Sequence, residues 1–441
     1  MLQRASTVFS RFVGPAALTA AGMIGAGAVA TRLLAGAWFG FELLWVTLIV
    51  IPMVIFTLDS ASRIGVTSGG RGLIELMRTD VGAWLAWGVF LPMALVNVVV
   101  NMSQMSAMVE GAYGAAGMLP PAGGEATAGL FVVTIVLTGS TVVAAVLGGY
   151  RRMETIMTTL LVVILICFIV VAIKGLLDWR TWPALASGLV PRIPADLPVF
   201  DQPERVRNGF RQIMAIAGQA LPPAVLLSYG YLAANSGYTT ATVKKTFWKT
   251  VTNLGVVWGL FSVVVIVAGA TALHNVYTGA GPVHLGVRHY SQIESIPVAG
   301  QVLGPAFPGA LGFLAPRFFS MGLIAAAFTT LISVSLTMTY FCLDIARKNW
   351  RFTDDNTLFK IVFATWIAVP AVVAPFWQLP ALLKAILAMV GNLLMAPLAV
   401  LIILFFVNRP ALGALRANAG RNAVLIVTFL FALGLVIYGL R

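Results

Sequence analysis

The chain contains about eleven apolar runs, each long enough to cross the roughly 30 Å hydrocarbon core of a bilayer as a helix. A backbone in lipid must satisfy its own hydrogen bonds, and such long runs do so as helices. We therefore predict an all-α polytopic membrane protein with a single transmembrane domain over residues 1–441. The predicted spans are 15–37, 41–62, 84–112, 128–149, 155–177, 210–235, 246–275, 317–343, 359–378, 381–407 and 421–440.

Charged residues are too rare for a soluble globule. They make up 10% of the chain, against 59% hydrophobic residues, whereas soluble domains carry about 25%. The net charge of +13 comes from Lys and Arg in alternate short loops, which is the footprint of membrane topology rather than of nucleic-acid binding. This pattern predicts an integral protein of a bacterial inner (plasma) membrane, with a cytoplasmic N-terminus and an external C-terminus.

Two spans carry matching clusters of helix-breaking residues. The segment Gly22–Val29 reads Gly-Met-Ile-Gly-Ala-Gly-Ala-Val, and Gly218–Val225 reads Gly-Gln-Ala-Leu-Pro-Pro-Ala-Val. Five spans separate their starts, so the two copies run in opposite directions, as in the inverted repeats of secondary transporters. Irregular backbone at membrane depth is tolerated where it lines a cavity. We predict broken helices one and six in a five-plus-five inverted repeat, with repeat one at 12–178, repeat two at 208–407 and an extra helix at 421–440.

The chain resembles the Nramp family of divalent-metal transporters along most of its length. The likeness is densest from Gly14-Pro15, through Gly36–Trp45 (Gly-Ala-x-x-Gly-x-x-Leu-Leu-Trp), to Arg63–Gly69 (Arg-Ile-Gly-Val-Thr-Ser-Gly). Members of that family are proton-coupled and share the fold of the amino-acid/sodium symporters. The resemblance implies this fold, with a transport site between the two broken helices.

The family's metal-site motifs are missing at the aligned positions. Asp-Pro-Gly-Asn of the family's first span aligns with Gly25–Ala28 (Gly-Ala-Gly-Ala), and Met-Pro-His of its sixth span aligns with Leu221–Pro223. The acids of the family's proton relay fall on Val98 and Asn101. The resemblance therefore carries over the scaffold, without side-chain metal ligands or a proton relay.

The predicted membrane interior holds a positive charge and no negative one. None of the 15 acidic residues falls near the middle of a span, whereas Arg32 lies one turn past the first break. Such a residue is a functional-site hypothesis by default, although Arg32 could instead snorkel to the interface or pair with Glu42 or Glu110. The half-helices that follow the breaks also point their N-termini, which favour anions, at the cavity. A carboxylate therefore fits this cavity better than a bare metal ion.

Neutral polar residues of spans three, six and ten could complete a site for a small solute, although each could instead form a hydrogen bond between helices. Hydroxyls of span eight resemble those that hold sodium in the symporter relatives. The predicted solute-binding residues are Gly25, Ala26, Gly27, Ala28, Arg32, Asn97, Asn101, Gly218, Gln219, Leu221, Tyr229 and Asn392, and those for a coupling ion are Thr329, Thr330 and Ser333.

We predict a secondary transporter that works by alternating access, with spans one, two, six and seven moving against the rest. The expected substrate is a small organic anion or polar metabolite, coupled to Na⁺ or H⁺, with no cofactor and no bound metal. Two alternatives are a divalent-cation transporter of Nramp type, handling Mg²⁺ kept partly hydrated, and a non-transporting receptor or scaffold. The sequence shows no nucleotide loop, HExxH or nucleophile–His–acid set, so we expect no enzyme activity.

Overall fold

The structure is a computed structural model that describes residues 19–20, 22–69, 71–119, 128–146, 162, 165–199, 202–235, 237–278, 293–304, 310–351 and 355–440. Within these ranges, nine helices are long and apolar enough to cross a membrane. The fifth predicted span is represented by the shorter apolar helix Leu165–Leu176, because its first part lies outside the described residues. The predicted all-α polytopic fold is confirmed.

The predicted spans correspond to helices that follow one another along the chain. Spans one to four and six are α3 (Ala26–Phe39), α4 (Leu44–Thr67), α6 (Ala83–Ala115), α7 (Ala128–Val146), and α10 (Gly209–Ala220) with α11 (Pro223–Asn235). Spans seven to eleven are α12 (Val243–Thr250) with the π-helical η2 (Val251–Trp258) and α13 (Gly259–Ala272), then α16 (Ala310–Ile345), α17 (Thr357–Val373), α18 (Ala381–Val407) and α19 (Ala419–Gly439).

Short helices and turns lie between these long helices along the chain. They are α5 (Leu73–Asp80), α9 (Thr181–Ser187), α14 (His274–Tyr277), α15 (Ile296–Leu303), and the 3₁₀ turns η5 (Ala374–Phe376) and η6 (Pro410–Leu415). The long loop before α10 also contains an antiparallel hairpin of β1 (Leu197–Val199) and β2 (Gln202–Arg207), in which Leu197 faces Arg207. No pattern in this loop predicts the hairpin.

Both predicted helix breaks are present. Gly25 has an extended backbone (φ −99°, ψ −178°), so α3 begins only at Ala26. Leu221 leaves the helical region (φ −115°, ψ 51°) and ends α10, while Pro223 starts α11. Proline lacks an N–H donor and tolerates the first turn of a helix, which explains why the chain restarts there. The limits proposed for the two repeats stay a prediction.

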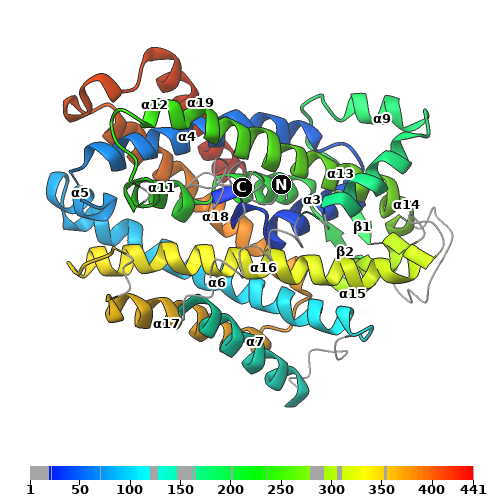
Figure 1. Cartoon of the computed structure of the whole chain (residues 1–441). Coiled ribbons are helices and arrows are strands. Elements are labelled where there is room, and N and C mark those ends of the chain that lie inside the picture. Colours follow the sequence, from blue (N-terminus) through cyan, green and yellow to red (C-terminus); the bar gives the residue numbers. More distant parts are fainter. Residues whose placement is uncertain are drawn as a thin grey trace, which may run out of the picture.

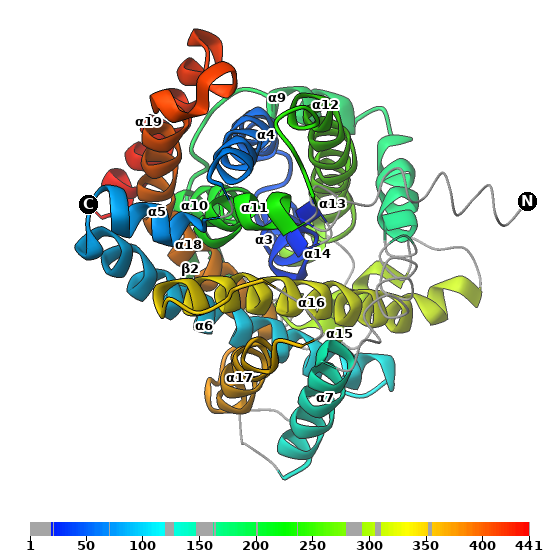
Figure 2. The ribbon, with the colours of Figure 1, turned by 60° about the vertical axis from the view of Figure 1, so that its left-hand side comes forward.

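The helices form an inner group surrounded by two outer groups (Figure 1). The broken helices α3 and α10–α11 lie in the interior, between α4 with α12–α13 on one side and α6 with α16 on the other. Figure 2 shows α7 and α17 on the far side of α6 and α16, and α19 at the edge beside α18. In the apolar 18-residue window of Gly209–Asn235, 94% of the residues are buried inside the protein, so the sixth span is a core element rather than a lipid-facing one.

Glycines bring α3 and α13 into close contact. A Cβ atom on Gly36 would lie 2.3 Å from the Ile266 carbonyl oxygen, and one on Gly269 would lie 2.4 Å from that of Leu33. Small residues allow such backbone approach in membrane helices, where packing replaces the hydrophobic effect as the driving force. The first and seventh spans therefore behave as one packed unit.

A polar ladder joins the second half of the sixth span to the eighth. The Ser228 and Thr337 hydroxyl oxygens are 3.2 Å apart, and Asn235 Nδ2 donates to the Tyr340 hydroxyl at 3.1 Å. Between them, the Tyr231 hydroxyl donates to Asp344, whose carboxylate also accepts the Glu75 backbone N–H of α5. The ladder therefore joins α11 to α16 and, through Asp344, to α5.

Candidate functional site

The two broken spans meet through one side chain. Gln219, the penultimate residue of α10, donates from Nε2 to the Met23 carbonyl oxygen at 2.7 Å. That carbonyl is free to accept because the extended backbone at Gly25 interrupts the helical hydrogen-bond pattern. Gly218 lies against α18, where a Cβ atom would be 1.9 Å from the Met389 carbonyl oxygen. The breaks are thus held together in the interior of the molecule.

A cavity of about 40 Å³ opens between the breaks. A buried water needs about 10–15 Å³ on this measure, so the cavity has room for a few waters or a small ion. It is far smaller than the roughly 300–1,000 Å³ of sites for drug-sized ligands. The residues that line it are Gly22, Met23, Gly25, Gly27, Ala28, Asn97, Val100, Gln104, Gln219, Pro222, Ala224, Val225, Thr330, Val334, Met389 and Asn392.

Neutral amides give this cavity its polar character. Asn97 and Gln104 come from α6, Gln219 from α10 and Asn392 from α18. The Gln104 Oε1 and Asn392 Oδ1 atoms are buried and have no hydrogen-bond partner among the described residues. An amide oxygen only accepts hydrogen bonds or coordinates cations. These two atoms therefore call for a donor or a cation in the cavity.

The described lining contains no Asp or Glu. Over the described ranges there is also no group of three or more His, Cys, Asp or Glu residues placed to hold a metal ion. A dehydrated transition-metal ion would thus meet only neutral groups, namely amides, a hydroxyl, backbone atoms and the methionines Met23 and Met389. Such a site suits an ion that keeps part of its water shell, because water then supplies the missing ligands.

Arg32 lies behind the cavity rather than on its wall. Its side chain is fully buried, and Nη1 donates to Gln219 Oε1 and, at 3.3 Å, to the Thr31 hydroxyl. Its guanidinium carbon is 5.0 Å from the centre of the Trp258 ring. Arg32 therefore does not snorkel to the membrane surface, and it reaches the cavity only through Gln219.

The two acids considered as partners of Arg32 are engaged elsewhere. Glu42 forms an ion pair with Arg192 at 3.2 Å. Glu110 accepts the backbone N–H groups of Ala381 at 2.7 Å and Ile296 at 3.2 Å, which begin α18 and α15. Its carboxylate thus caps two helix N-termini, a favourable place for negative charge.

The predicted solute-binding residues divide into two sets by position. The structure brings Gly25, Gly27, Ala28, Asn97, Gln219 and Asn392 to the cavity, and it places Ala26, Arg32, Asn101, Gly218, Leu221 and Tyr229 away from the lining. Asn101 Nδ2 instead donates to Ser335 Oγ at 3.0 Å and to the Trp366 carbonyl at 2.9 Å. The Tyr229 hydroxyl lies 3.3 Å from that of Thr250. Binding by any of these residues stays a prediction.

Two of the three hydroxyls predicted for a coupling ion lie against the first break. Thr330 Oγ1 donates to the Gly22 carbonyl oxygen at 2.6 Å, and a Cβ atom on Gly22 would lie 2.5 Å from Ser333 Oγ. Thr329 Oγ1 instead donates within its own helix, to the Ala326 carbonyl at 2.9 Å. Binding of a coupling ion by Thr329, Thr330 or Ser333 stays a prediction.

The predicted site residues leave out nine residues of the cavity wall: Gly22, Met23, Val100, Gln104, Pro222, Ala224, Val225, Val334 and Met389. Gln104 follows Asn97 and Asn101 at helical spacing, so the three share one face of α6. That spacing could have identified it. Met389 carries no comparable signal, because unbranched apolar residues are common throughout membrane helices.

Comparisons with known proteins agree with this architecture. The family model described as "Natural resistance-associated macrophage protein-like" matches residues 16–441. A relative from Verminephrobacter eiseniae, called divalent metal cation transporter MntH, is 23% identical over 331 residues, which are 74% of this chain and 67% of that protein. The matches to the first curated relatives span only about two fifths of those proteins' length, 39% and 40%.

Solved structures show the same fold. A mutant of the Eremococcus coleocola manganese transporter superposes with a TM-score of 0.68 at 16% identity, covering 97% of this chain and 85% of that one. MhsT in complex with L-phenylalanine superposes with a TM-score of 0.60 at 16% identity, covering 96% and 97%. The chain is an integral membrane protein with a transporter fold and belongs to the Nramp (natural resistance-associated macrophage protein-like) family.

Proposed function

We propose that this protein is a secondary transporter of a divalent metal cation, which it binds with part of the hydration shell, and that Mg²⁺ is the cation whose chemistry fits best. Family membership and the names of its relatives support the substrate class. The observation that carries the proposal is the pair of unpartnered amide oxygens, Gln104 Oε1 and Asn392 Oδ1, at a cavity with room for a few waters. Mg²⁺ dehydrates reluctantly and usually keeps several waters.

The organic anion expected from the sequence fits the observations less well. The comparisons give it no support, because the curated relatives carry the name of divalent metal cation transporters. Arg32, the residue expected to bind a carboxylate, lies behind Gln219 and outside the lining. The cavity presents acceptors where an anion needs donors. The divalent-cation alternative is therefore the better reading.

Transport in this proposal follows alternating access around the central cavity. The ladder between α11 and α16 keeps the predicted cytoplasmic half closed, and it separates when the broken helices move. Coupling to Na⁺ is part of the proposal, because Thr330 and Ser333 flank the Gly22 carbonyl. We place the protein in a bacterial plasma membrane with the N-terminus in the cytoplasm and the C-terminus outside.

Uptake into proteoliposomes tests the proposal. The purified full chain is reconstituted, and Mg²⁺ or Mn²⁺ entry is followed with an indicator trapped inside, with or without a Na⁺ gradient. We expect saturable Mg²⁺ entry that exceeds Mn²⁺ entry and is weakened by Asn392→Leu. Asn408→Leu is the matched control, because Asn408 directly follows the end of α18 and pairs with Asn422 rather than facing the cavity.

Two results would contradict the proposal. Saturable uptake of a radiolabelled carboxylate, without any divalent-cation entry, would restore the organic-anion reading. Absence of saturable uptake of every solute tried, by a folded and correctly inserted protein, would favour the receptor or scaffold reading.

A further inference from the structure

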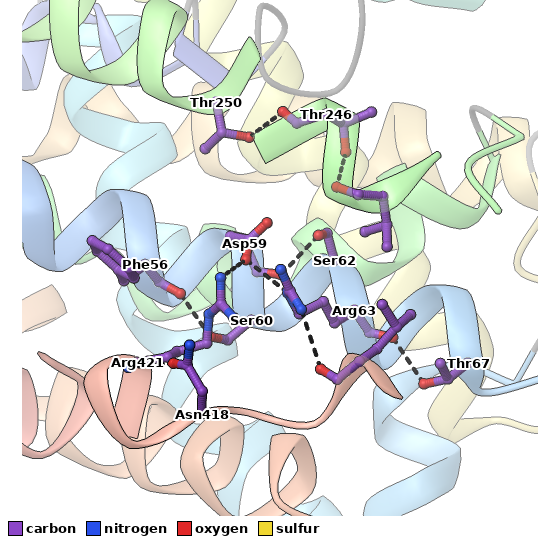
Figure 3. Close-up of polar contacts among 12 residues, drawn as sticks. Phe56, Asp59, Ser60, Ser62, Arg63, Thr67, Thr246, Thr250, Asn418 and Arg421 are labelled. Carbon is purple, nitrogen blue, oxygen red and sulfur yellow. Dashed lines mark hydrogen bonds and ion pairs between the residues drawn. The ribbon is translucent and has the colours of Figure 1, made fainter. Parts of the chain in front are cut away.

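Arg32 is a buried positive charge without a counter-ion. The other strongly buried arginines have one: Arg63 and Arg421 both bond to Asp59, at 2.8 and 2.6 Å. Figure 3 shows these two guanidinium groups converging on that carboxylate. The largely buried Arg207 pairs with Glu294 in the same way. No carboxylate of the described residues reaches Arg32, although an uncompensated charge inside a membrane protein is costly.

Three donor nitrogens at this place have no acceptor among the residues that the structure describes. The Arg32 Nη1 atom bonds to Gln219 and Thr31, but Nε and Nη2 are buried without a partner. Trp258 Nε1 is also buried and unpartnered, and it belongs to the ring that the Arg32 guanidinium covers at 5.0 Å. Such groups in a folded protein call for an explanation, and an ion at the site is one of the few available.

The chemistry of these donors selects the ligand. Arginine and indole nitrogens only donate hydrogen bonds, so they suit an anion and reject a metal cation. The ligand must also be small, because the side chains of Arg32 and Trp258 are fully buried. These conditions fit a monatomic anion better than a phosphate or an organic acid.

We propose that Arg32 and Trp258 form an internal binding site for a halide ion, chloride under ordinary conditions, between α3 and the start of α13. The site lies directly behind Gln219, whose side chain lines the central cavity. A halide there balances the guanidinium charge and lowers its repulsion of a cation in the cavity. The proposal does not depend on which solute the protein carries.

Thermal unfolding of the purified full chain tests the site without any transport assay. The midpoint is measured while chloride replaces gluconate at constant ionic strength, because a ligand of the folded state raises the midpoint in a concentration-dependent way. We expect a saturable rise of several degrees. Arg32→Gln should abolish the chloride-dependent rise, and Trp258→Phe, which keeps an aromatic ring but loses the N–H, should shift the titration to at least tenfold higher chloride.

Arg192→Gln is the matched control, because Arg192 is an exposed arginine paired with Glu42. It should leave the chloride titration unchanged. An unsubstituted protein whose midpoint does not respond to chloride overturns the proposal, as does an equal response in Arg32→Gln.

Anomalous scattering gives a second test that needs no variant. Crystals of the unsubstituted protein grown in bromide should show a bromide peak in hydrogen-bond contact with Arg32 Nε or Nη2 and with Trp258 Nε1. Water or an organic group at that position overturns the halide assignment. This result holds even if Arg32→Gln fails to fold, and it is independent of whether Mg²⁺ is transported.

Discussion

Two amide side chains, Gln104 on α6 and Asn392 on α18, give the central cavity its preference for donors and cations. Both oxygens are buried and unpartnered among the described residues, and the described wall holds no acid. Neutral ligands bind a divalent ion weakly, because they do not offset its charge. The lack of acidic ligands on the described wall distinguishes this cavity from a site that binds a fully dehydrated transition-metal ion.

A carboxylate placed on this wall should therefore tighten cation binding. We expect Gln104→Glu to raise the affinity for Mn²⁺ and Mg²⁺ at least tenfold, because a negative charge attracts a divalent ion strongly at low dielectric. Calorimetry on the purified protein measures the change. Gln104→Met, which keeps the length but removes the oxygen, should lower the affinity, and equal binding by both variants would show that Gln104 is not a ligand.

Asp80, at the end of α5 outside the spans, gives a prediction on pH. Burial would raise the pKa of its carboxyl, but the hydrogen bond from Thr79 and the charges of Arg409 and Arg71 outweigh it and lower the pKa. The folded state thus favours ionised Asp80, a contribution that is complete above the unfolded pKa of about 3.9 and lost as the pH falls through the lower folded pKa.

Asp80→Asn should consequently reduce stability at pH 7 by less than about 1 kcal/mol, as expected for a partly exposed ion pair. The unfolding midpoint of variant and parent should converge as the pH is lowered below 4. A difference that stays constant over this range would show that the carboxylate charge is not its cause.

Among the secondary-structure elements, α19 is attached to the second span by an ionic cluster. Arg421 of α19 and Arg63 of α4 share Asp59, and Arg63 Nη1 also donates to the Leu415 carbonyl of η6 at 3.3 Å (Figure 3). Only 17% of the most apolar window of α19 is buried. The cluster therefore supplies an ionic contact to a helix that lies largely outside the packed interior.

Removing the shared carboxylate should lower the free energy of unfolding more than removing one arginine. Asp59→Asn leaves two buried guanidinium groups unpaired, and we expect it to lower the free energy of unfolding by about 3–5 kcal/mol. Arg421→Met leaves the Arg63–Asp59 pair intact and should lower it clearly less. Unfolding of the detergent-solubilised protein in denaturant compares them, and equal losses would contradict a shared role for Asp59.

At the scale of the whole molecule, the polar ladder joins α11 to α16. Its three contacts connect the half-helix after the second break to a helix that the proposed mechanism keeps stationary. Each neutral contact contributes about 1 kcal/mol, and the hydrogen bond to the Asp344 carboxylate contributes about 1.5–3 kcal/mol. In the proposed mechanism these contacts hold one side of the cavity closed, and they break when α11 moves away from α16.

A disulfide bond in place of one ladder contact should hold α11 and α16 together. Ser228→Cys with Thr337→Cys replaces hydroxyls 3.2 Å apart, in a background where the native Cys167 and Cys342 are changed to serine. We expect an oxidant to stop uptake and a reductant to restore it, with each single-cysteine variant unaffected. Full uptake by the cross-linked protein would show that these helices need not separate.

Much of this architecture follows from local features of the sequence. Apolar length places the spans, and the Gly-rich and Pro-Pro clusters place both breaks, because a missing Cβ or a missing N–H acts on the backbone at that position. The absence of acids from the described cavity wall is visible in the same way. The hairpin at β1 and β2 was missed, since its strands are short and lie in a polar loop.

The contacts between spans were decided by the packing of the folded chain. The sequence allowed Arg32 to face the solute, the lipid surface or an acid, and the fold instead places it against Gln219 and Trp258. Gln104 and Met389 joined the cavity wall only because α6 and α18 turn those faces towards the breaks. Hydropathy fixes where a helix crosses the membrane, but its rotation and neighbours depend on side-chain packing with partners far away in the sequence.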